Sequence, residues 1–222
     1  MAIDSLSCAM LKANYPYEFY EVLLQFHSDR GEKDKVGALK AEMKKAFGIQ
    51  EGPYQFGEDN RKFNAIPERK IIQPSLLSVK GLSQDLANDL YELSQTKQFD
   101  NFVDLLREFD HMRSMNSAKL DTLIKLNYFS QFAPIGKLLN IVELYNKFAT
   151  RKTLKESDVT SLPAPVQAVI AKYTVKPKTQ YKITDNDGML RELAEMVGER
   201  PITMMMRLGW EKDFLGYCAS TD

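Results

Sequence analysis

The sequence predicts a mainly α-helical protein that contains one small β-hairpin or irregular ribbon, with helices on either side of it. Apolar residues recur at the three- and four-residue spacing of amphipathic helices along most of the 222 residues. Residues that favour helix ends, chiefly serine, asparagine and glycine, stand between these stretches. Alternation typical of strands is confined to Phe63–Ile72, around Pro67.

Three helices are predicted before residue 50. The first spans Asp4–Asn14 and ends before a proline, because the residue that precedes proline is disfavoured in the helical region. Pro16 suits the first position of the second helix. The third helix spans Glu32–Phe47, and Gly48 is placed to end it. Because the first helix starts almost at the first residue, we interpret the sequence as part of a longer protein; a natural start with a short helix is the alternative.

The next helical stretch begins after a tight turn at Gly81. Ser83 is a good N-cap, and apolar residues follow it at helical spacing: Leu86, Leu90 and Leu93. A glycine turn that leads into a helix N-terminus presents unpaired backbone N–H groups, which can bind an anion. If that anion is a nucleic-acid phosphate, the turn is half of a helix-hairpin-helix unit; a plain turn is the alternative.

Three more helices are predicted before residue 149. One begins near Asp100, and another is capped by Asn116 or Ser117 and ends at Asn127, which tolerates left-handed geometry. The last runs from Pro134 to about Phe148. Two helix–turn–helix pairs therefore lie roughly 45 residues apart, and they form an approximate duplication in pattern.

The C-terminal third is predicted as short helices joined by linkers. A helix opens at Leu162–Pro165, a linker covers Val175–Tyr181, and an amphipathic helix spans Asp187–Val197. Another helix begins at Thr203. Its residues Met204–Met206, with Trp210, are predicted to lie in the core or on a docking face.

The charge balance and the residue types of the sequence argue against an enzyme, a metal protein and a membrane-bound protein. Thirty lysines and arginines balance thirty aspartates and glutamates, so no overall charge attracts nucleic acid or a membrane. The two cysteines, Cys8 and Cys218, are interpreted as reduced thiols of a cytoplasmic protein. His27 and His111 stand alone, and no nucleophile–base pair, metal cluster or phosphate loop is present. We therefore expect no catalytic residue, metal or cofactor and no membrane partner.

Five motifs, in this order, resemble bacterial DNA polymerase III alpha subunits, the family C replicative polymerases. Leu11–Phe19 (LKANYPYEF) resembles a signature near the end of the fingers, and Lys33–Ile49 is similar to the family's segment before its extended, proline-containing linker. Leu77–Leu82 (LSVKGL) and Leu123–Phe129 (LIKLNYF) resemble the two hairpins of the family. Trp210–Tyr217 (WEKDFLGY) resembles the step before its OB domain.

The resemblance implies a fragment that contributes duplex DNA binding to DNA replication. It assigns residues 1–50 to the end of the fingers, 51–75 to an extended linker with the hairpin, 76–150 to a tandem helix-hairpin-helix region, and 151–222 to a helical linker before a missing OB domain. The catalytic carboxylates of this DNA-directed DNA polymerase family lie upstream, so the fragment is expected to be inactive alone. Its expected partners are duplex DNA and the rest of the polymerase. The expected DNA-binding residues are Lys80, Gly81, Leu82, Ser83, Lys119, Lys125, Asn127, Tyr128, Ser130 and Lys137.

Two departures from the family pattern weaken the expected DNA contact. Ser83 and Asn127 stand where the family has glycine, and the bulky Tyr128 follows the latter. Residues 76–148 carry eight lysines and arginines against nine aspartates and glutamates, a net charge of −1. We therefore predict weak, sequence-independent and salt-sensitive duplex binding, mainly through backbone amides. A helical protein-interaction or scaffolding module is the alternative.

Overall fold

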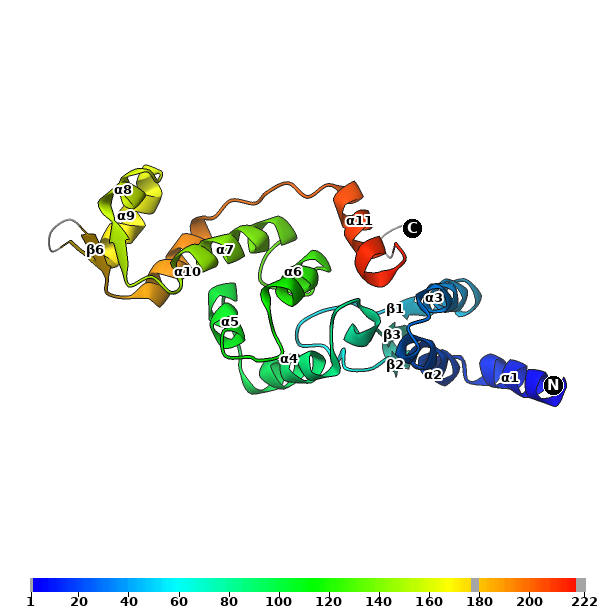
Figure 1. Ribbon diagram of the computed structural model, residues 1–222. Coiled ribbons are helices and arrows are strands. Elements are labelled where there is room, and N and C mark those ends of the chain that lie inside the picture. Colours follow the sequence, from blue (N-terminus) through cyan, green and yellow to red (C-terminus); the bar gives the residue numbers. More distant parts are fainter. Residues whose placement is uncertain (1, 177–179, 219–222) are drawn as a thin grey trace. The chain divides into compact units, whose positions relative to one another are not determined.

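A computed structural model describes residues 2–176 and 180–218 of the chain (Figure 1). The protein is mainly helical, with 60% of its residues in helices, and two small three-stranded sheets accompany the helices. The chain divides into two compact units. The first unit comprises Met1–Gln98, Arg113–Phe129 and Thr203–Asp222, and the second comprises Phe99–Met112 and Ser130–Ile202.

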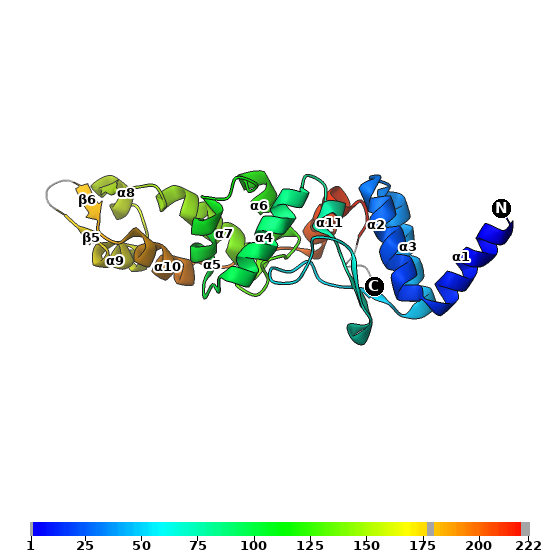
Figure 2. The same cartoon turned by 90° about the horizontal axis from the view of Figure 1, so that it is seen from below.

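Three helices open the first unit, as predicted. α1 (Ala2–Asn14) and α2 (Pro16–Asp29) are separated at Tyr15, and Pro16 occupies the first turn of α2. α3 (Lys33–Phe47) ends at Gly48, whose φ of 68° is left-handed. α2 and α3 pack side by side in both views of the chain (Figures 1 and 2).

The predicted hairpin forms part of the first sheet. β2 (Asn64–Ile66) pairs antiparallel with β3 (Ile71–Gln73), and a 3-10 turn that starts at Pro67 joins them. A third strand that the sequence did not reveal, β1 (Gln50–Glu51), pairs parallel with β3. Two side chains of α2 accept hydrogen bonds from backbone N–H groups at the β2 edge. Gln25 accepts from Phe63, just before β2, and Glu21 accepts from Ala65 within it. This covers an edge that could otherwise pair with another strand.

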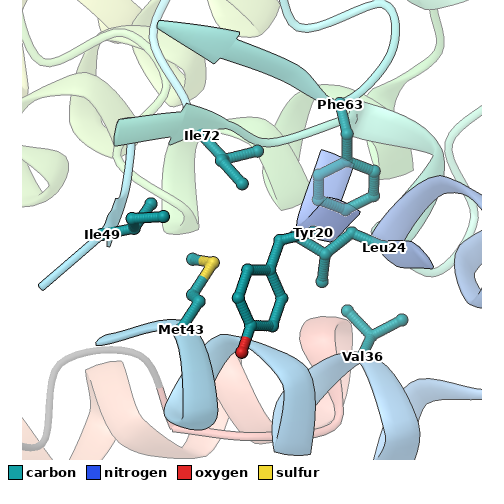
Figure 3. Close-up of a cluster of buried hydrophobic side chains, with 7 residues drawn as sticks. All are labelled: Tyr20, Leu24, Val36, Met43, Ile49, Phe63 and Ile72. Atoms are coloured by element: carbon teal, nitrogen blue, oxygen red, sulfur yellow. The ribbon is translucent and has the colours of Figure 1, made fainter. Parts of the chain in front are cut away.

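The core of this part of the first unit lies between α2, α3 and the first sheet. Tyr20 and Leu24 of α2 face Val36 and Met43 of α3 (Figure 3). The sheet side of the cluster consists of Ile49, Phe63 and Ile72. Tyr20 and Leu24 are completely inaccessible to solvent. Burial of these apolar side chains is the main source of stability here.

The segment between β1 and β2 is anchored by one buried asparagine. The Asn60 amide donates to the carbonyls of Pro53 and Pro74, at 3.3 and 2.8 Å. The backbone carbonyl of Asn60 in turn accepts from the backbone N–H of Leu76. Leu76–Ser78 forms a 3-10 turn, which leads to α4 (Gln84–Thr96). The anchored segment thus fixes the approach of the chain to the Gly81 turn.

Two further helices complete the first unit. α6 (Ser117–Lys125) is capped by Asn116, whose side chain accepts from the N–H of Lys119. α11 (Met204–Leu215) contacts α6, and Gly216 ends it in left-handed geometry. Tyr128 and Phe129, which follow α6, form a cluster of buried aromatic rings with Phe56 from the segment between β1 and β2.

The second unit is built on three helices that contact one another, namely α5 (Phe102–Phe109), α7 (Ile135–Phe148) and α10 (Asn186–Met196). The Asn186 amide donates to the carbonyls at the end of α7, which lack helical partners. Segment 199–200 crosses α7 at Gly136, where an added Cβ would lie 2.0 Å from the Arg200 carbonyl oxygen. Only glycine fits at this crossing.

The prediction of a single strand region is wrong, because the second unit contains another sheet. In it, the central strand β6 (Gln180–Ile183) pairs antiparallel with β4 (Thr153–Lys155) and β5 (Thr174–Val175). The predicted linker Val175–Tyr181 is therefore a strand at both ends, and its Pro177 lies outside the described residues. Strands of two to four residues are too short to produce a readable alternation.

The remaining helices of the second unit flank this sheet. α8 (Glu156–Thr160) was not predicted, whereas α9 (Ala164–Lys172) opens at the proline-rich segment as expected. The N-cap of α5 is Asn101, whose side chain accepts from the N–H of Asp104, and not Asp100 as predicted. Within the described residues, no helix is long and apolar enough to cross a bilayer.

Candidate phosphate-binding turn

The Gly81 turn is exposed and tightly closed. The N–H of Leu82 donates to the Val79 carbonyl at 3.3 Å, and Gly81 has a φ of 87°. A glycine with positive φ at the third position is typical of a type II turn. An added Cβ on Gly81 would meet no atom within 4 Å, so glycine is required here by backbone conformation rather than by space.

The turn leads directly into α4 with its first amides uncovered. Ser83 caps the helix through its hydroxyl, which accepts from Leu86 at 3.5 Å. Among the residues that the structure describes, the N–H groups of Gly81, Ser83, Gln84 and Asp85 have no acceptor. Such groups, together with the positive end of the helix dipole, favour a bound anion.

Two lysines lie beside these amides. The Lys80 side chain is exposed, and Lys33 reaches the same region from α3. Burial, together with the nearby Lys80 ammonium, lowers the pKa of Lys33. An anion placed between the two ammonium groups would relieve their repulsion. The sequence did not single out Lys33 as a site residue, because only the fold brings α3 next to the turn.

The second candidate turn ends a helix instead of starting one. Asn127 has a φ of 62°, as predicted for a left-handed residue. The N–H of Asn127 donates to Ile124, and that of Tyr128 donates to Leu123. This pair of bonds is the Schellman arrangement, in which the amides satisfy the last carbonyls of the helix. These two N–H groups are therefore already used.

The lysines among the other predicted site residues already contact groups of this chain. Lys119 donates to the Ser114 carbonyl at 2.6 Å, and Lys125 pairs with Asp121 at 2.5 Å. Lys125 also lies 5.5 Å from the centre of the Trp210 ring. In the second unit, Lys137 donates to the Glu195 carbonyl and Ser130 is exposed. α6 and α7 belong to different units, and the predicted second hairpin therefore includes residues of both.

The side chain of Tyr128 is buried, and we therefore expect it to make the free energy of unfolding depend on pH above pH 10. Burial raises the pKa of its phenol above the usual value of about 10. Well below pH 10 both the folded and the unfolded chain keep this proton, so its contribution to the free energy of unfolding does not change with pH. As the pH rises further, only the unfolded chain loses it, and the free energy of unfolding falls by up to about 1.4 kcal/mol per pH unit. Tyr128→Phe should flatten this decline in urea unfolding at pH 10–11.5; equal slopes would contradict it.

A hollow of about 440 Å³ lies next to α4, but its charges are balanced. Glu21 and Asp59 oppose Arg61 and Lys62 along its wall. Arg61 is bound to Asp59 through two nitrogens, and Glu21 accepts from Ala65. Elsewhere in residues 2–176 and 180–218, no group of three or more acidic, histidine or cysteine side chains could hold a metal.

No model of a known protein family matches the sequence, and a search of curated proteins finds no match.

Proposed function

We propose that this chain binds duplex DNA without sequence preference, through the Gly81 turn, as part of a bacterial replicative DNA polymerase. The observation that carries the proposal is the run of uncovered amides at Gly81, Ser83, Gln84 and Asp85. The ordered motifs of the sequence supply the replicative context. Backbone amides recognise phosphates and carry no base information, so binding would be independent of sequence.

The proposed contact is asymmetric. The first turn offers free amides together with Lys80 and Lys33, whereas the amides of Asn127 and Tyr128 are used within their own turn. The second turn would therefore contact DNA chiefly through side chains, for which Lys119 and Lys125 must exchange their present partners. The carboxylate of Asp85, which is exposed in the first turn of α4, would repel a phosphate bound there. These features favour weak binding.

A titration of labelled duplex DNA with the protein tests this proposal. Fluorescence anisotropy at low salt should give a dissociation constant that is the same for unrelated duplex sequences. The logarithm of affinity should fall with the logarithm of salt concentration, with a slope of about −0.9 for each phosphate neutralised. The absence of binding at high micromolar protein would contradict the proposal for this chain.

A second candidate function is a protein-interaction module, which exposed apolar side chains favour. On α1, Leu6, Met10 and Leu11 are each more than half exposed, and on α11 Met205 is 82% exposed. The prediction that Met204–Met206 lie in the core is therefore wrong, and the docking-face alternative is retained. If this is the function, substitutions at Gly81 should not change the affinity for duplex DNA.

A further inference from the structure

A buried polar cluster at the end of α11 is connected to the Gly81 turn through the backbone of Phe214–Tyr217, because the Phe214 carbonyl accepts from the N–H of Lys80. Lys40 of α3 is only 7% exposed, and its ammonium donates to Glu51 at 2.6 Å. The Tyr217 hydroxyl accepts from the same ammonium and donates to both carboxylate oxygens of Glu51 at 3.2 Å. Burial raises the pKa of Tyr217, so its hydroxyl keeps the proton that it donates.

The backbone before Tyr217 is shaped to reach this cluster. Gly216 has a φ of 87°, and an added Cβ would lie 3.2 Å from the Lys33 side chain. A residue other than glycine would therefore be strained by its conformation and crowded by Lys33. The Tyr217 ring also lies 4.7 Å from the Lys40 ammonium, which adds a cation–π contact.

The same segment holds the Gly81 turn directly. The Phe214 carbonyl, in the last turn of α11, accepts from the backbone N–H of Lys80 at 2.9 Å. It also accepts from the Lys33 ammonium at 2.9 Å. A carbonyl in the last turn of a helix has no helical donor, so these two bonds replace the missing one. Phe214 thus connects α11 with both lysines beside the proposed phosphate site.

We propose that Phe214–Tyr217 is a latch that positions the Gly81 turn, with Tyr217 as its anchoring residue. The cluster of Lys40, Glu51 and Tyr217 fixes the end of α11, and Phe214 then fixes Lys80. The Lys40 ammonium is buried and donates to both Glu51 and Tyr217, so a shift that removes these acceptors would leave a buried charge uncompensated. Tyr217 is a positioning residue because it acts on the turn through Phe214. The consequence for DNA affinity rests on the proposed function.

Tyr217→Phe tests the latch, because it removes the hydroxyl and leaves the ring and the Lys40–Glu51 pair in place. Hydrogen exchange at the Lys80 amide should become about tenfold faster, the factor that corresponds to one net hydrogen bond. Duplex affinity should fall severalfold in the same variant. Tyr15→Phe is the matched control, because Tyr15 is 58% exposed and lies outside the cluster. It should change neither readout.

The two readouts separate the latch from the proposed function. Unchanged exchange at Lys80 would overturn the latch, and faster exchange with unchanged duplex affinity would overturn its role in DNA binding. If the wild-type chain binds no duplex, the proposed function fails, and the exchange rate at Lys80 alone decides whether the latch exists. Gly216→Ala, which displaces the segment by backbone strain, should accelerate the same amide if Tyr217→Phe does; a slow amide in both variants would contradict the latch.

Discussion

Leu24→Ala is expected to lower the free energy of unfolding by about 2–5 kcal/mol. Leu24 is fully buried between α2, α3 and the first sheet, where it packs among the side chains drawn in Figure 3. Truncation to alanine removes buried apolar atoms and leaves a cavity that the surrounding helices and sheet can fill only in part. The midpoint of urea unfolding, followed by far-UV circular dichroism, measures the change.

Val22→Ala is the matched control for Leu24→Ala. Val22 lies on the same helix but is 65% exposed, so its truncation should change stability by no more than about 0.5 kcal/mol. Equal losses in the two variants would mean that the cluster between α2 and α3 is not the core of the first unit.

Gly81→Asp is expected to weaken duplex binding at least about tenfold. The new carboxylate would lie next to the uncovered amides and repel the phosphate that they are proposed to bind. The backbone of the new aspartate would also have to keep the φ of 87°, at a cost of about 1–2 kcal/mol. Because an added Cβ on Gly81 meets no atom within 4 Å, the substitution should leave the fold intact. Anisotropy at low salt measures the affinity, and circular dichroism checks the fold.

Gly48→Asp provides the control for this substitution. Gly48 is exposed, has a φ of 68° and likewise has no atom within 4 Å of an added Cβ. The variant therefore introduces the same charge and a comparable backbone strain at the end of α3, away from the proposed site. Its duplex affinity should match that of the wild-type chain. Equal affinity of wild type and Gly81→Asp would instead favour the protein-interaction module.

Local chemistry explains which parts of the fold the sequence could predict. The caps at Ser83 and Asn116, the proline at the start of α2 and the left-handed Gly48 all satisfy needs of the adjacent backbone. Those needs are met by residues next to each other in the chain, so they are readable without the fold. The mainly helical class followed from the same signals.

Features that depend on distant residues could not be predicted in this way. β1 is defined by its pairing with β3, and the second sheet forms from strands of two to four residues. Lys33 joins Lys80 only because α11 brings both to the Phe214 carbonyl. The left-handed geometry of Asn127 was predicted correctly, but its role in a Schellman ending, which occupies the amides, became visible only in the hydrogen bonds.

An NMR titration tests whether the uncovered amides of the Gly81 turn bind phosphate. Amide resonances of ¹⁵N-labelled protein are followed while duplex DNA is added at low salt. The largest shifts should occur at Gly81, Ser83, Gln84 and Asp85, and added salt should reverse them. Duplex binding that shifts other amides and leaves these four unchanged would contradict phosphate binding at this turn.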